Sequence, residues 1–260
     1  MRLDETYEGH EVFRHLSDYA DFYKSLSFSV FAFVSLGTKA VCNIDSYVYK
    51  SMRGTLESIK HSLLNRRIAD AYTLLRRYHD SAVINIYSNL YLKDNFSIEN
   101  FVVDKIQNWL EGKDPLPRYG DMLKYIEGSV EVAQINKLLS ENTRYREIRK
   151  RCNDFTHYNF YRTLLLNDNE VFLNRTKTLE GFSRDLDNIL IWHLSYLFLL
   201  NQHYMMSSDY MDSLECGSTP PKDSQYLVAP FVQKIFDSVV KTNRMDIATE
   251  IMNTTAMKLE

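Results

Sequence analysis

Residues 144–162 hold the side chains of this sequence that are most suited to chemistry. Five of the first eight are basic and only Glu147 is acidic, in a chain whose net charge is -3. Arg151 and His157 bracket five residues within this segment. Metal-free cleavage of an RNA phosphodiester needs a group that transfers protons and a group that stabilises the charged phosphate. A histidine that titrates near neutral pH supplies the first and a permanently charged arginine fork supplies the second.

We therefore interpret Arg151 as a phosphate-binding residue and His157 as a general acid/base. The remaining basic residues of the segment are candidates for RNA binding, because a local basic patch can hold a phosphate backbone. They are Arg144, Arg146, Arg149 and Lys150. The alternative interpretation is a solvated helix face.

Asn153 and Asp154 are expected to hold the geometry of this pair of residues. Either is a good N-cap, so a helix is predicted to begin there, with Arg151 in the preceding turn. His157 would then lie in the first turn of that helix, where backbone N–H groups favour a phosphate. The alternative is that Arg151 and His157 tie two helices together, through Asp154 for example.

The stretch from Arg151 to His157 resembles the Arg-x4–6-His motif of the HEPN superfamily of helical-bundle proteins. A polar residue usually follows the arginine in that family, whereas Cys152 follows it here. The resemblance covers the motif and the helical architecture of about residues 60–215. It implies a metal-independent endoribonuclease of bacterial stress or phage defence, of the toxin or abortive-infection type. It also implies a homodimer in which two motifs form one cleft, together with an antitoxin or regulatory partner.

Two other classes of function remain open. One is a non-catalytic helical scaffold, such as a degenerate HEPN protein that binds RNA or a partner protein. The other is a regulatory subunit that covers another enzyme. The resemblance does not extend to the first 50 residues or to the C-terminal tail, so it assigns them no role.

A second polar cluster, Arg76–Asp80, lies within a predicted helix over 68–92. Arg76 and His79 are candidates for RNA binding, and His79 could also orient His157. The alternative is an ordinary surface pair between Arg76 and Asp80, which are four residues apart.

Several familiar site patterns are missing from the sequence. It has no GxGxxG or Walker loop to hold a nucleotide phosphate, and no HExxH or CxxC pair to bind zinc. His193 and His203 are ten residues apart on one predicted helix, too far to chelate one ion. Asp185 and Asp187 are two apart, so they face different directions. We expect neither a metal nor a cofactor.

The bulk composition indicates a cytoplasmic protein. The three cysteines are odd in number and scattered, which favours a reduced compartment without disulfides. The first 25 residues are polar and acid-rich, unlike a signal peptide. The most apolar run, 26–36, is too short to span a bilayer, which takes about 20 residues. No membrane contact is expected.

With only 8 Gly and 5 Pro in 260 residues, long helices are favoured over hairpins. Apolar spacing predicts an all-α helical bundle with additional N-terminal and C-terminal helices. The bundle is expected over 1–215, followed by a linker at 216–225 and a helical tail at 226–260. The predicted helices are 68–92, 97–111 with Ser97 as N-cap, 121–140, a central helix over 176–206, 226–242 and 245–258.

Overall fold

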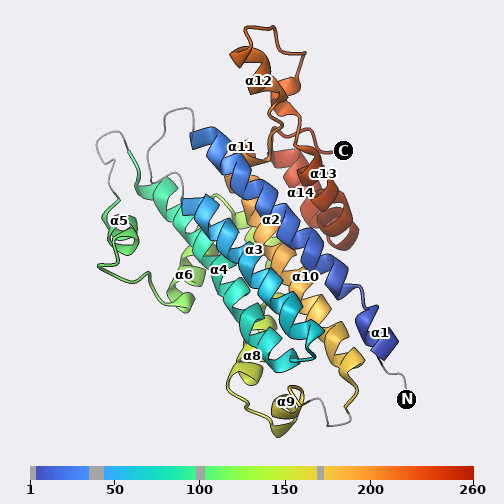
Figure 1. The fold of residues 1–260 in the computed structure, drawn as a ribbon. Coiled ribbons are helices and arrows are strands. Elements are labelled where there is room, and N and C mark those ends of the chain that lie inside the picture. The colour runs from blue at the N-terminus through green and yellow to red at the C-terminus, as the bar shows by residue number, and fades with distance from the viewer. Residues whose placement is uncertain (1–3, 35–43, 98–102, 169–172) are drawn as a thin grey trace.

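The structure is a computed structural model that describes residues 4–34, 44–97, 103–168 and 173–260. Within these ranges the regular elements are helices, and the only strand-like pairings are two isolated bridges, Met206 with Val228 and Leu227 with Lys258. The predicted all-α helical bundle is thus confirmed (Figure 1). In chain order the helices are α1 (Asp4–Glu8), α2 (Val12–Val34), α3 (Ile44–Leu64), α4 (Ile68–Asn95), α5 (Asp104–Leu110), α6 (Tyr119–Gly128), α7 (Ala133–Ser140), α8 (Arg144–Thr156), α9 (Tyr161–Leu165), α10 (Arg175–Leu200), α11 (Gln202–Met205), α12 (Asp209–Glu215), the 3-10 turn η2 (Ser224–Tyr226), α13 (Pro230–Ile235), the π-helix η3 (Phe236–Lys241) and α14 (Met245–Thr254).

Four long helices form the body of the molecule. Helix α2 packs on α3, α3 on α4, α4 on α10, and α10 back on α2, which closes a four-helix bundle (Figure 1). Two of these four helices come from the first 64 residues, so the N-terminal part of the chain is integral to the bundle. The shorter helices α6, α7 and α8 lie against α4 and α10. They form the side of the bundle that carries the basic segment.

The apolar stripe of α4 shows why these helices pack. The predicted face consists of residues spaced four and seven apart, and every member is fully buried: Ile68, Leu75, Ala82, Ile86 and Leu90. Helix α10 is buried nearly all round from Leu186 to Phe198, which confirms it as the central helix. It ends at Leu200, and Gln202–Met205 form the separate short helix α11.

The single helix predicted over 121–140 is wrong, because the chain forms α6 and α7 with a turn between them. Gly128 ends α6, and the side-chain amide of Asn136 donates hydrogen bonds to the carbonyls of Ile126 (2.9 Å) and Glu127 (3.2 Å). These are carbonyls that a helix end leaves without an internal partner. The fully buried Val132 fixes the turn in the core.

Helix α5 is shorter than the predicted 97–111. It begins at Asp104 with Val103 as its N-cap residue, so Ser97 is not the cap. Val103 and Ile106 pack with Ile44 in a small apolar cluster, which positions the helix without a capping side chain. Residues 98–102 lie outside the described ranges.

The segment 226–260 packs on the bundle. Its helices run through α13, the π-helix η3 and α14, close to the predicted 226–242 and 245–258. Val232, Phe236, Ile247 and Ile251 are fully buried and join the main apolar core. The buried Arg244 donates hydrogen bonds to the Tyr145 hydroxyl, the carbonyl of Leu138 and Asp246. Arg244 therefore fastens this segment to α7 and α8.

The described residues include two of the three cysteines and all the long helices that could be tested for crossing a membrane. Cys152 is buried and Cys216 exposed, both as free thiols, while Cys42 lies outside the described residues. Among the helices described, none has the length and apolar character that crossing a membrane requires.

Candidate functional site: the basic helix α8 and its two flanks

Helix α8 carries the basic segment and presents different groups to its two sides. Tyr145, Ile148 and Cys152 form its buried face, at the spacing of three and four that defines one side of a helix. This face packs against α4 and α10. The basic side chains are divided between the two flanks of that buried stripe.

On the α10 flank, Arg151 is held by two carboxylates. Its Nε and Nη2 donate to the two oxygens of Asp185, at 2.9 and 2.5 Å, and its Nη1 donates to Glu147 at 3.2 Å. The hydrogen bond to Asp185 raises the pKa of Arg151 above its ordinary value. The Asp185 side chain is only 4% exposed and that of Arg151 is 38% exposed. The pair is therefore a bidentate bridge that joins α8 to α10.

Arg151 lines an open pocket of about 570 Å³ between α8 and α10. Arg144 and Arg184 line the same pocket, together with Asp185 and Asp187. Although the two aspartates share this pocket, they bond in different directions, as their spacing predicts. Asp185 bonds α8, whereas Asp187 accepts from the Tyr19 hydroxyl (2.7 Å) and pairs with His15 Nδ1 (3.0 Å) on α2.

His157 does not lie where the sequence interpretation placed it. No helix begins at Asn153 or Asp154, because α8 continues to Thr156 and His157 is its C-cap residue. The His157 N–H bonds the carbonyl of Asn153 (3.0 Å), and the chain turns at Tyr158, whose φ is 48°. A helix C-terminus presents carbonyl oxygens, which do not attract a phosphate as an N-terminus would. The side chain of His157 is exposed.

Arg151 and His157 therefore occupy separate surfaces of one protomer. Six residues of α-helix turn through a net angle of about 120°. Arg151 lines the pocket on the α10 flank, and His157 is absent from the residues that form it. The tie between helices runs from Arg151 to Asp185 and not through Asp154, which instead accepts from the side chain of Asn159 (2.8 Å).

The opposite flank of α8 gathers the other predicted residues. His79 of α4 lines a pocket of about 430 Å³ with the basic residues of α8 and with Asn153: Arg146, Arg149 and Lys150. Arg149 donates through Nε to Asp80 (3.1 Å), and its guanidinium lies 3.8 Å from the centre of the Tyr119 ring. Arg76 pairs with the same Asp80 (3.8 Å), so the predicted pair exists but is shared.

His79 is buried and does not approach His157 through any hydrogen bond in the described part of the chain. Its ring packs edge-to-face against Tyr119 and Trp192. Burial lowers the pKa of His79 to about 4, so the ring is neutral at physiological pH. The residues that sequence reasoning missed on this flank are its partners Tyr119 and Trp192, and on the other flank Asp185. Each contacts its partner from a different helix, which leaves no local signal in the sequence.

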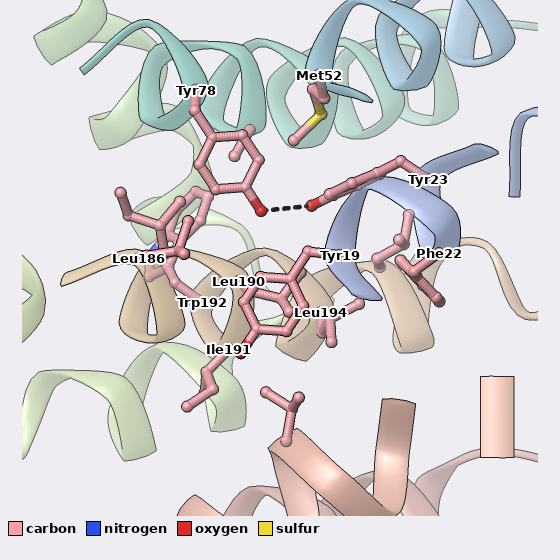
Figure 2. Close-up of a cluster of buried hydrophobic side chains, with 14 of the residues drawn as sticks. Tyr19, Phe22, Tyr23, Met52, Tyr78, Leu186, Leu190, Ile191, Trp192 and Leu194 are labelled. Carbon is pink, nitrogen blue, oxygen red and sulfur yellow. Dashed lines mark hydrogen bonds between the residues drawn. The ribbon is translucent and has the colours of Figure 1, made fainter. Parts of the chain in front are cut away.

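A second buried histidine, His193, belongs to a hydrogen-bonded chain in the bundle core. Its Nε2 bonds Asn85 Oδ1 (2.8 Å), and its Nδ1 bonds the Tyr23 hydroxyl (2.7 Å), which also bonds the Tyr78 hydroxyl (2.9 Å). Figure 2 shows the last two hydroxyls pointing toward one another from α2 and α4. Asn85 in turn donates to Asp45 (2.7 Å).

The direction of each hydrogen bond in this chain follows from the chemistry. An amide oxygen can only accept, so His193 Nε2 carries the proton and Nδ1 is the acceptor. Tyr23 therefore donates to His193, and Tyr78 donates to Tyr23. Burial lowers the pKa of His193 to about 3 and raises that of Asp45 to about 6. His193 is thus a neutral core residue with both nitrogens satisfied.

In the described ranges, no group of three or more His, Cys, Asp or Glu side chains is arranged to hold a metal ion. Comparison of the chain with protein-family models, with curated proteins and with solved structures gave no match.

Proposed function

We propose that the protein is a non-catalytic, RNA-binding helical bundle and that α8 is its RNA-binding helix. The observation that carries this proposal is that the basic residues of α8 differ in their contacts. Arg151 is fixed by the buried Asp185, whereas Arg146 and Lys150 are exposed on the other flank. Exposed basic side chains aligned on one helix can contact successive phosphates without any catalytic geometry.

The pairing of Arg151 argues for a structural role. Withdrawing Arg151 would leave the carboxylate of Asp185, which is only 4% exposed, without its charged partner, and a buried charge without a partner destabilises the fold. A scissile phosphate would have to compete with Asp185 for the same two-pronged donor set. Arg151 therefore serves best as the residue that positions α8 against α10.

Charge reversal on α8 tests the RNA-binding proposal. We expect Arg146→Glu/Lys150→Glu to weaken binding of a fluorescein-labelled single-stranded RNA at least tenfold in an anisotropy titration. The matched control, Lys24→Glu/Lys222→Glu, makes the same change in net charge at two exposed positions away from α8. For about three phosphate contacts, log K should fall with log salt with a slope of about -2. Equal losses in both double variants would contradict a specific role for α8.

A metal-independent homodimeric endoribonuclease is the second candidate, and one observation favours it. Exposed aromatic side chains follow His157 directly: Tyr158 is 44%, Phe160 60% and Tyr161 76% exposed. An apolar surface of this kind suits a second copy, and a two-fold interface that includes residues 144–162 would bring two His157 side chains near one another. The resemblance to HEPN proteins would then place the enzyme in bacterial stress or phage defence, with an antitoxin covering the same surface.

Cleavage assays separate the two candidates. If the enzyme candidate is right, His157→Ala lowers RNA cleavage by about a hundredfold or more and leaves the melting temperature unchanged, because the side chain is exposed. Tyr161→Ser should then reduce both dimerisation and cleavage. Binding of RNA by the wild type without cleavage, or a strict monomer at micromolar concentration in sedimentation, would support the non-catalytic candidate. Cleavage that a chelator abolishes and magnesium restores would contradict the metal-independent mechanism.

A further inference from the structure

The pocket on the α4 side of α8 has the construction of a small-molecule site. It has a volume of about 430 Å³, within the range of about 300–1,000 Å³ that is usual for ligand pockets. Five helices contribute to it: His79 comes from α4, Trp192 from α10 and Arg149 from α8, while α6 and α7 supply the remaining wall. Because several elements of the bundle converge on it, the shape of the pocket is set by the fold.

Two residues that line this pocket each have a buried polar atom with no hydrogen-bond partner among the described residues. These atoms are Nδ1 of His79, a residue only 4% exposed, and Oδ1 of Asn153. A buried polar atom left unpaired costs about 1–3 kcal/mol, so two beside one pocket are a substantial penalty. Both atoms have less than 1 Å² of accessible surface, so a ligand that moves the side chains covering them and hydrogen-bonds them would remove that penalty. Their presence therefore indicates the polar end of a bound molecule.

Aromatic rings form most of the pocket's buried wall. Trp192, Tyr145 and Tyr196 are each less than 10% exposed, and Tyr119 lies at the edge beneath Arg149. The hydroxyls of Tyr145 and Tyr196 are already bonded, to Arg244 (2.9 Å) and Asn136 (2.7 Å). These tyrosines therefore offer their rings, which pack well against a planar aromatic group.

The rim of the pocket is positively charged. Arg146, Arg149 and Lys150 line it against a single carboxylate, that of Glu127. Arg149 is already oriented, because its Nε is bonded to Asp80 and its plane lies over Tyr119. Among the described residues Arg149 makes a side-chain hydrogen bond only through Nε, so its two terminal amino groups remain as donors for an anion. A pre-oriented guanidinium loses little freedom when it binds an oxyanion.

We propose that this pocket binds a small molecule that combines a planar heteroaromatic ring with an anionic group. The ring would lie among Trp192, Tyr145 and Tyr196, and a small movement of the covering side chains would let it hydrogen-bond His79 and Asn153. The anionic group would contact Arg149 and its neighbours. The proposal rests on the pocket alone and holds whether or not α8 binds RNA. The anion can be a phosphate, as in a nucleotide, or a carboxylate, as in an aromatic acid.

Isothermal titration calorimetry of the full chain with two charged probes tests the proposal and distinguishes the two anions. Adenosine 5′-monophosphate represents the phosphate arm and indole-3-carboxylate the carboxylate arm, with adenosine and indole as uncharged counterparts. We expect one charged probe to bind at least tenfold more tightly than its uncharged counterpart. No binding of either charged probe up to millimolar concentration would overturn the proposal.

Two variants locate the binding. Asn153→Leu removes the unpartnered oxygen while keeping a similar volume, and Arg149→Met removes the oriented donor group. Each variant should weaken the affinity for the probe at least tenfold, whereas Arg77→Met on the exposed side of α4 should leave that affinity unchanged. If Asn153→Leu fails to fold, a Trp109→Phe background leaves Trp192 as the single tryptophan. Adenosine 5′-monophosphate should then protect its fluorescence from acrylamide, and Arg149→Met should abolish that protection. Unchanged affinity in both pocket variants would overturn the assignment.

Discussion

His193 and His79 are two buried histidines of the same bundle, and the difference between them separates structure from function. Both are desolvated, which lowers the pKa of His193 to about 3 and that of His79 to about 4. His193 bonds through both nitrogens to protein groups, whereas Nδ1 of His79 has no partner among the described residues. A polar group whose bonds are all made inside the protein contributes to the fold. A buried polar group that stays unpaired beside a pocket is better explained by a ligand that the pocket binds.

Removing each imidazole in turn should separate the two histidines most clearly. His193→Leu should lower the free energy of unfolding by about 3 kcal/mol or more, because the Tyr23 hydroxyl and Asn85 Oδ1 lose their partners in the core. His79→Leu removes an unpaired atom, so its change should stay within about 1 kcal/mol. Denaturant unfolding followed by circular dichroism measures both. Similar losses in the two variants would show that His79 also has a structural role.

Acid should destabilise the fold through the same two histidines. In the unfolded chain both histidines become protonated below about pH 6.5. In the folded protein they stay neutral down to about pH 4 for His79 and about pH 3 for His193. The free energy of unfolding should therefore fall by about 1.4 kcal/mol per pH unit for each histidine as the pH drops below 6.5.

Asp45 acts in the opposite direction in this experiment. Its folded pKa is raised to about 6, so its contribution is lost as the pH rises from about 4 to 6. Between pH 7 and 5, the free energy of unfolding of the wild type should fall more steeply than that of His79→Leu. The difference is the contribution of one histidine. Parallel curves would contradict the neutral, buried state of His79.

A smaller difference in stability should distinguish two buried amides, those of Asn153 and Asn85. Asn153→Leu replaces an amide whose buried oxygen is unpaired, so the melting temperature should stay within a few degrees of the wild type or rise slightly. Asn85→Leu is the matched control, because the Asn85 amide bonds both Asp45 and His193. That variant should melt well below the wild type. Differential scanning calorimetry of the pair measures the contrast, and an equal fall in both would remove it.

The sequence predicted those parts of the fold that depend on local pattern. The spacing of Ile68, Leu75, Ala82, Ile86 and Leu90 is enough to define α4 and its buried face, because amphipathic periodicity lies within one helix. The turn between α6 and α7 was missed, because a contact from Asn136 back to Ile126 ends the first helix. Capping residues also misled the interpretation. Asn153 is a good N-cap by type, but packing of Ile148 and Cys152 carries α8 past it.

The sequence indicates which segment carries the candidate residues and does not indicate how they are arranged. The density of basic residues singled out 144–162 in the sequence, and the α8 helix formed there lines both pockets. The partner of Arg151 is 34 residues away, and the pocket of Asn153 includes His79 and Trp192 from two other helices. Spacing within one segment carries no information about such contacts. They arise only when α4, α8 and α10 pack together.

The bonds made by Arg244 have a consequence for how this molecule is assembled during synthesis. Its partner Tyr145 precedes it by 99 residues, and its second contact, the carbonyl of Leu138, precedes it by 106. While the ribosome makes the intervening chain, that side of α7 and α8 has neither its buried arginine nor the apolar cover of α14. The pocket wall that contains Tyr145 is thus completed about a hundred residues after it is translated, and a nascent chain shorter than this presents α8 without its anchor.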